Sequence, residues 1–128
     1  MMQTLDQKRA TLAWLFATEG VGRHGTEYRN LAKGAPALIM TSGLMPTLAY
    51  YKSKGNAARQ LLDDLIRGIE HRLACRELKA GQGISEFGSL MVRLQRGDSA
   101  TYLRHTDEAL ELLKWIRQFV DAVEAQGA

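Results

Sequence analysis

Apolar residues recur at intervals of three and four positions along most of this 128-residue sequence. That interval places them on one face of an α-helix. The clearest example is the segment 57–80, whose apolar positions are Ala58, Leu61, Leu62, Leu65, Ile66, Ile69 and Leu73. No segment shows the convincing alternation of apolar and polar residues that marks a half-buried strand. The pattern therefore predicts an all-α protein.

The same periodicity, combined with capping residues, predicts six helices. They cover approximately residues 4–18, 26–42, 45–54, 57–80, 85–96 and 98–125. Residues suited to accept backbone hydrogen bonds at an N-cap precede or open several of them, namely Thr4, Asn56, Ser85 and Asp98 or Ser99. Gly43 is suited to a C-cap. The short connections indicate a compact single-domain helical bundle over residues 1–128.

Glycine and proline predict two interruptions of these helices. Three glycines between positions 20 and 25 predict that the first helix ends near Thr18 and that a loop follows. Pro36 disfavours helical backbone at Ala35. We therefore expect a break or kink inside the second segment, with helix resuming over 36–42.

The last segment is apolar over an unusually wide arc. Its inner stripe is predicted to comprise Leu103, Leu110, Leu113, Ile116, Val120 and Val123. Leu112, Trp115 and Phe119 extend the apolar surface beyond that stripe. A helix of this kind is usually buried on two sides or in contact with another chain. Trp115 and Phe119 are therefore candidate subunit contacts.

Composition excludes several classes of protein. Apolar residues make up 45% of the chain and charged residues 24%, as in a folded globular domain. The longest unbroken apolar stretch, 12–17, is too short to span a membrane, and charged residues precede it. We therefore expect neither a membrane segment nor a secretory signal. Cys75 is the single cysteine, which excludes a disulfide scaffold and favours a reducing cytoplasm.

Charge is distributed unevenly along the chain. The net charge is +3, but residues 1–60 carry eight basic and three acidic residues, whereas residues 61–128 carry nine and eleven. Within the second half, residues 72–96 are basic and residues 98–128 are acidic. A basic half on a small domain is a weak indication of a polyanionic partner.

The run Gly20-Val21-Gly22-Arg23-His24-Gly25 matches the letters of a dinucleotide-binding fingerprint. That fingerprint functions between a strand and a helix of a parallel sheet, which this sequence does not predict. The simpler interpretation is a loop between two helices. An intermediate alternative places Arg23 and His24 at a helix N-terminus, where backbone N–H groups could meet a phosphate.

The other reactive residue types do not form a catalytic or metal-binding pattern. The three histidines are too scattered to share a metal ion. Asp63 and Asp64 would point about 100° apart on a helix, so they are interpreted as surface charges that complement its dipole. Cys75 is interpreted as a half-buried apolar position in the long helix. We therefore predict no catalytic residues, no metal and no cofactor.

The segment Tyr50-Tyr51-Lys52-Ser53-Lys54 is a stronger functional signal. It places two aromatic rings beside two ammonium groups, close to Arg59. Nucleobases stack on aromatic rings while Lys and Arg meet phosphates. The alternative is an ordinary helix end, with lysines complementing its dipole and Tyr51 in the core.

Further basic residues recur at helical spacing. Arg72, Arg76 and Lys79 would share one face of the long helix, and Arg93 and Arg96 repeat the pattern on the next. A solvated face is the simplest interpretation of one such stripe. Several stripes in one small domain favour a polyanionic partner.

Two stretches of the chain resemble a known family. The first contains Tyr28-Arg29-Asn30-Leu31-Ala32-Lys33, Pro36-Ala37-Leu38-Ile39, Ser42-Gly43-Leu44 and the run from Thr47 to Gly55. The second contains Tyr102-Leu103-Arg104, Thr106, Glu108-Ala109-Leu110, Leu113, Trp115 and Phe119. In this order they resemble the small α-helical subunit of the type III-B CRISPR effector, the Cmr RAMP-module complex. The resemblance spans roughly residues 5–125.

The resemblance implies an all-α, non-catalytic subunit that stacks in several copies beside the backbone subunits holding the guide RNA. Those partners would cleave RNA, while this chain would contribute positive surface along the channel of guide and target RNA in antiviral defence. Candidates for that surface are Arg23, Lys52, Lys54, Arg59, Arg72, Arg76, Arg93 and Arg96. The alternatives are the equivalent small subunit of a type III-A complex and a stand-alone helical adaptor.

Overall fold

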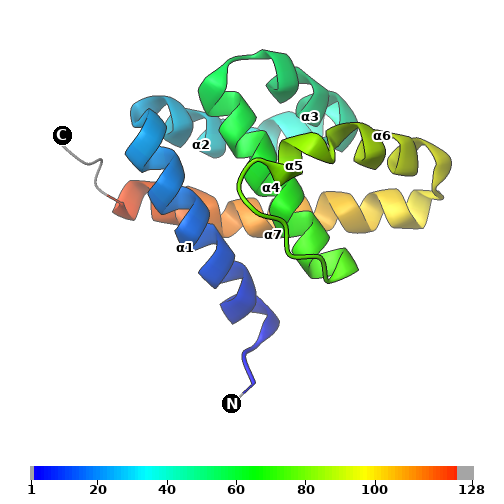
Figure 1. Cartoon of the computed structure of the whole chain (residues 1–128), viewed down its shortest axis with the longest axis horizontal. Coiled ribbons are helices and arrows are strands. Elements are labelled where there is room, and N and C mark those ends of the chain that lie inside the picture. Colours follow the sequence, from blue (N-terminus) through cyan, green and yellow to red (C-terminus); the bar gives the residue numbers. More distant parts are fainter. Residues whose placement is uncertain (1, 124–128) are drawn as a thin grey trace.

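The computed structural model of the chain describes residues 2–123, which form seven α-helices and no β-strand. The helices are α1 (Leu5–His24), α2 (Thr26–Ser42), α3 (Leu44–Ser53), α4 (Asn56–Ala74), α5 (Gln82–Ser85), α6 (Phe87–Arg96) and α7 (Ser99–Ala122) (Figure 1). The predicted all-α fold class is confirmed. Over residues 2–123, the structure has one helix more than the six predicted. The additional helix is the single turn α5, and the α6 that follows it is shorter than the predicted helix 85–96.

Capping residues begin the first and last helices as the sequence predicts. Thr4 and Gln7 form a capping box, in which the Gln7 N–H donates to Thr4 Oγ1 at 3.1 Å and the Thr4 N–H donates to Gln7 Oε1 at 2.7 Å. Asp98 Oδ1 accepts a hydrogen bond from the Thr101 N–H at 2.8 Å, which lowers the pKa of the Asp98 carboxyl. These bonds satisfy N–H groups that have no partner within the helix.

The prediction that a glycine cluster ends the first helix early is wrong. Gly20 and Gly22 lie within α1, which continues to His24, and Gly25 then turns the chain with a φ of 59°. Packing explains Gly20, since a side chain there would collide with the ring of Tyr28 on α2. The glycine motif is therefore part of a helix and does not form a nucleotide-binding loop.

The expected break before Pro36 is also absent, because α2 runs without interruption from Thr26 to Ser42. Pro36 removes one backbone donor from the helix. Buried contacts on both sides of it, through Ala32, Ala35 and Ile39, hold the segment in helical geometry. The predicted end at Gly43 is confirmed, with a φ of 95°.

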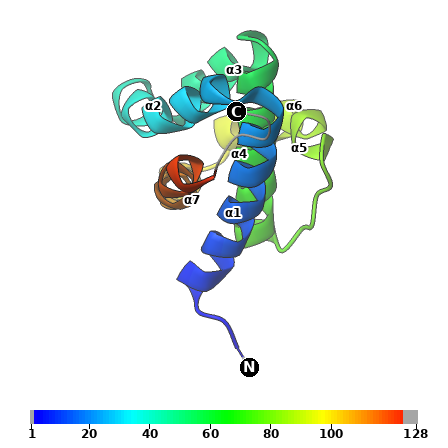
Figure 2. The same cartoon turned by 90° about the vertical axis from the view of Figure 1, so that its left-hand side faces the viewer.

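α4 is shorter than the periodicity predicts. Gly55 is its N-cap, so the predicted cap at Asn56 is wrong, and Asn56 is its first residue. The helix ends at Ala74 instead of residue 80, because Cys75 adopts a left-handed conformation with a φ of 53°. Residues 75–81 then form an extended strap that passes back along α4 (Figures 1 and 2). Cys75 is exposed on this strap, so its interpretation as a half-buried helical residue is wrong. Ser85 ends α5 and does not cap the following helix.

α7 lies across α1, α2 and α4 and supplies much of the core (Figure 2). Its buried apolar side chains include Leu112, Leu113, Ile116 and Val120. Leu112 packs directly onto Gly68 of α4, where any side chain would collide with it. This close contact brings the apolar faces of α4 and α7 together.

The predicted inner stripe of α7 is correct in its C-terminal half and wrong at Leu103. That residue is 58% exposed, because the first turns of α7 extend past α4. Glu108 is buried instead, since Arg9 of α1 donates to both of its carboxylate oxygens at 2.8 and 2.9 Å. The predicted continuation of the helix over 124–125 lies outside the described residues.

Within the described residues, none of the helices combines the length and the apolar character needed to cross a membrane. The same residues contain no group of three or more His, Cys, Asp or Glu side chains placed to share a metal ion.

Candidate nucleic-acid interface

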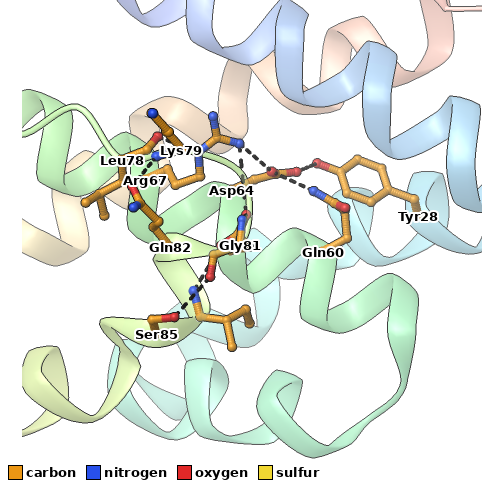
Figure 3. A network of polar contacts seen from close by, with 11 residues as sticks. Tyr28, Gln60, Asp64, Arg67, Leu78, Lys79, Gly81, Gln82 and Ser85 are labelled. Carbon is orange, nitrogen blue, oxygen red and sulfur yellow. Dashed lines mark hydrogen bonds and ion pairs between the residues drawn. The ribbon is translucent and has the colours of Figure 1, made fainter.

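Asp64 lies in the core, not on the surface (Figure 3). Its carboxyl oxygens accept hydrogen bonds from the Tyr28 hydroxyl at 2.7 Å and from the Gln60 amide at 3.0 Å. Burial raises the pKa of this carboxyl to about 8, and burial together with Asp64 raises that of Tyr28 well above its usual value. The interpretation of Asp64 as a surface charge is therefore wrong.

The neighbouring Asp63 is buried as well, and it holds the strap against α4. Its carboxylate accepts hydrogen bonds from the backbone N–H groups of Gly81 at 3.0 Å and Ile84 at 2.9 Å. Arg67, one turn further along α4, donates to the carbonyl of Leu78 at 2.9 Å. These charge-assisted bonds to backbone groups explain why 75–81 leaves the helix that its sequence pattern predicts.

A hollow of about 390 Å³ opens beside this polar core. It is lined by side chains from the end of α1, the start of α4 and the strap, namely Arg23, His24, Asn56, Arg59, Gln60, Asp63, Ala80, Gly81 and Ile84. Arg23 and His24 occupy the last turn of α1, so they are not at a helix N-terminus. The hollow thus brings Arg23 and Arg59 together, although they are far apart in the sequence.

Two further predicted residues, Lys52 and Lys54, lie at the end of α3, and the first of them contacts Arg59 through its backbone. The Arg59 guanidinium donates to the carbonyl of Lys52 at 2.9 Å. The ammonium of Lys52 lies 5.3 Å from the centre of the Phe87 ring, and that of Lys54 lies 5.0 Å from the centre of the Tyr50 ring. We call Arg23, Lys52, Lys54 and Arg59 the basic end of the molecule. None of these four forms an ion pair with a carboxylate among residues 2–123.

The other four predicted residues lie outside the basic end. Arg93 and Arg96 share the last turn of α6, as their spacing predicts, whereas Arg72 and Arg76 do not share a helix. Arg76 lies on the strap and pairs with Glu70 and Glu86 at 3.2 and 2.8 Å, while Arg93 of α6 also pairs with Glu70. These acids neutralise both guanidinium groups. The predicted shared face of residues 72, 76 and 79 is wrong because α4 has already ended.

Arg72 and Arg96 remain as isolated candidates. Arg72 is half-buried on α4, and its Nε is enclosed without a hydrogen-bond partner among the described residues. Arg96 is exposed at the end of α6. Neither belongs to the basic end.

Trp115 and Phe119 lie between α7 and α1. The Phe119 ring is 5.2 Å from that of Trp14 in an edge-to-face arrangement and 5.8 Å from that of Trp115. Trp115 and Phe119 are half-buried against the core, whereas Trp14 is 49% exposed. We call these three residues the aromatic cluster. Its exposed member, Trp14, was not among the residues that the sequence singled out.

Arg29 and Lys33 of α2 have structural roles that the sequence analysis did not assign. Arg29 donates to the carbonyls of Val120 and Val123, at 3.0 and 3.4 Å, and so satisfies the end of α7. Lys33 pairs with Asp121 at 2.9 Å. Both residues therefore hold α2 against α7. Their four-residue spacing, which places two basic side chains on one face of a helix, is the feature of the sequence that could have indicated this role.

The fold and the basic end define a small helical protein with one cationic end. Residues 5–123 match the family described as CRISPR-associated protein (Cas_Cmr5). The chain is 31% identical over 117 residues to the CRISPR system Cmr subunit Cmr5 of Thermotoga maritima, covering 91% of this chain and 82% of that protein. It is 29% identical over 108 residues to the subunit of the same name in Thermus thermophilus, covering 84% and 82%.

A solved structure gives the same result. The crystal structure of a CRISPR-associated Cmr5 family protein from Thermus thermophilus superposes with a TM-score of 0.72 at 27% identity, over 95% of this chain and 98% of that one. The chain belongs to the Cmr5 family. The predicted resemblance to the small subunit of the type III-B (Cmr) CRISPR effector is thereby confirmed.

Proposed function

We propose that this chain is a non-catalytic subunit of a cytoplasmic type III-B CRISPR effector and that its basic end meets the backbone of guide or target RNA. The observation behind the proposal is that Arg23 and Arg59 line one hollow, that Lys52 and Lys54 lie at the end of α3 next to Arg59, and that none of the four pairs with a carboxylate among the described residues. Exposed cations attract phosphates without reading sequence. In a guide-dependent complex, base pairing supplies the sequence specificity.

Stacking of several copies, and contact with the guide-bearing backbone subunit, form the second part of the proposal. The aromatic cluster supports it, because Trp14 leaves half of a large apolar ring exposed beside two half-buried rings. Exposed aromatic rings are typical of the centre of protein interfaces. The first turns of α1, which extend beyond the other helices, carry further exposed apolar surface at Leu5 (Figure 1).

The first test replaces three residues of the basic end by glutamine, as Arg23→Gln, Lys52→Gln and Lys54→Gln together. These changes remove positive charge but keep a polar, flexible side chain at each position. We expect RNA affinity at moderate salt to fall roughly tenfold or more, and the slope of log affinity against log salt to decrease by about 2, at about 0.7 for each lost single-strand phosphate contact. Filter binding over a salt series measures both quantities.

The matched control removes three positive charges elsewhere, through Lys8→Gln, Lys114→Gln and Arg117→Gln. All three residues are exposed on α1 or α7, away from the basic end. We expect this variant to retain most of the RNA affinity and salt slope. Equal losses in the two variants would show that net charge alone, and not the basic end, governs binding.

A further inference from the structure

Tyr50 stands between two apolar grooves on the outer side of α2 and α3. The first groove has a volume of about 400 Å³ and is lined by Asn30, Leu31, Gly34, Ala37, Leu38, Thr41, Tyr50 and Tyr51. The second, of about 410 Å³, is lined by Leu38, Ser42, Pro46, Thr47 and Tyr50. Tyr50 therefore forms a wall of both, and it remains 49% exposed while its neighbour Tyr51 is buried.

The first groove has the composition of a site for a small planar group. Its surface is mainly apolar, and the Asn30 amide and the Thr41 hydroxyl add two groups that can both donate and accept hydrogen bonds. Gly34 keeps it open, because the space that a side chain would occupy there contains no atom within 4 Å. Pockets for small ligands combine an apolar lining with a few polar groups in this way.

Positive charge lies next to the same ring. The Lys54 ammonium is 5.0 Å from the centre of the Tyr50 ring, and Lys52 lies on the same short helix end. Tyr50, which lines both grooves, therefore lies beside Lys54 of the basic end, where a phosphate backbone is proposed to run. A nucleotide combines a flat apolar face with an adjacent negative charge, and this pairing matches an exposed aromatic ring beside a lysine.

We propose that the groove between α2 and α3 takes one unpaired nucleobase of the RNA, stacked on Tyr50, with the adjoining phosphate on Lys54. This inference rests on the proposed RNA binding and adds to it, because backbone contacts alone would not distinguish unpaired from paired RNA. A chain with such a site binds single-stranded RNA more tightly than a blunt duplex of the same length.

The test uses the purified full chain and a short single-stranded oligoribonucleotide that carries one 2-aminopurine, whose fluorescence is quenched by stacking. Wild-type protein should quench the probe. Tyr50→Phe should retain the quenching, whereas Tyr50→Ala should abolish it and weaken single-strand binding by roughly tenfold. Affinity for a blunt RNA duplex should be unchanged in both variants.

Two further variants keep the test decisive. Gly34→Leu fills the groove without altering Tyr50 and should reproduce the loss of quenching, while Leu103→Ala, at an exposed apolar residue on α7, should have no effect. Thermal unfolding should show that each variant is folded.

The possible results separate this inference from the proposed function. If Tyr50→Ala and Gly34→Leu bind and quench the probe like the wild type, while binding still depends on the basic end, the nucleobase site is disproved and the proposed function stands. If both variants bind and quench the probe like the wild type but no longer co-purify with another effector subunit in a pull-down, the groove is a protein-docking surface and the inference is likewise wrong. If the wild-type protein binds neither the single-stranded RNA nor the duplex with salt-sensitive affinity, the proposed function is wrong, and the nucleobase site, which rests on it, is wrong as well.

Discussion

At the scale of single residues, the adjacent Asp63 and Asp64 show how position determines the role of identical side chains. Consecutive helix residues point in different directions, so one carboxylate holds the strap and the other lies in the core. Asp63 accepts two backbone hydrogen bonds, whereas Asp64 is surrounded by α2 and α4 and is difficult to ionise. Sequence alone could not reveal this, because two acids near a helix start are usually solvated.

The raised pKa of Asp64 predicts that unfolding free energy depends on pH. The folded state retains a proton up to about pH 8, whereas the unfolded chain releases it near pH 4. Stability from this group is therefore fully present below about pH 4 and is lost as the pH rises towards 8, by about 1.4 kcal/mol per unit at most. Asp64→Asn should remove this dependence, as urea unfolding over that range would show.

Asp98→Asn provides the control for that experiment. The pKa of Asp98 is lowered by its hydrogen bond to Thr101, so between about pH 5 and pH 8 this carboxyl is ionised in both states and its contribution to stability does not change. The variant should be slightly less stable but keep the wild-type slope. Parallel slopes for the wild type and Asp64→Asn would contradict the raised pKa.

At the scale of helices, the sequence predicts elements whose signals are local. The caps at Thr4 and Asp98 and the end at Gly43 all lie within a few residues of the groups they satisfy, and all three are confirmed. Signals that depend on distant partners were missed. α4 ends early because Asp63 and Arg67 bind the strap. The end of this helix is therefore determined by tertiary contacts, not by the periodicity of its apolar residues.

The candidate site follows the same rule. The run Tyr50–Lys54 and Arg59 are close in sequence, and their common location was predictable. The pairing of Arg76 and Arg93 with Glu70 was not predictable, because it joins residues of the strap, α6 and α4. Spacing identifies which residues share a helix face only while the helix continues.

Replacing Gly20 or Gly22 of α1 by alanine should change the unfolding free energy in opposite directions. Gly20→Ala should lower the unfolding free energy by about 1–3 kcal/mol, because the new methyl group collides with the buried Tyr28 ring. Gly22→Ala should raise it by up to about 1 kcal/mol, because this helical position faces open space and alanine favours helix. Chemical denaturation of both variants measures the difference. Equal effects at the two positions would contradict the close packing of α1 on α2.

At the scale of the whole molecule, the basic end and the aromatic cluster lie on different parts of the surface. The basic end gathers where α1 and α3 finish and α4 begins, while the aromatic cluster lies on the α1–α7 side (Figure 1). The proposed function uses this separation, with RNA at one surface and protein partners at another. One domain can then contact both without competition between them.

The most direct test of this arrangement is photocrosslinking within the assembled effector, using target RNA that contains 4-thiouridine, followed by mass spectrometry of this chain. We expect crosslinked peptides that contain Arg23 or the run from Tyr50 to Arg59. Crosslinks confined to α7, or an RNA-loaded complex in which this chain forms none, would contradict the claim that the basic end faces RNA.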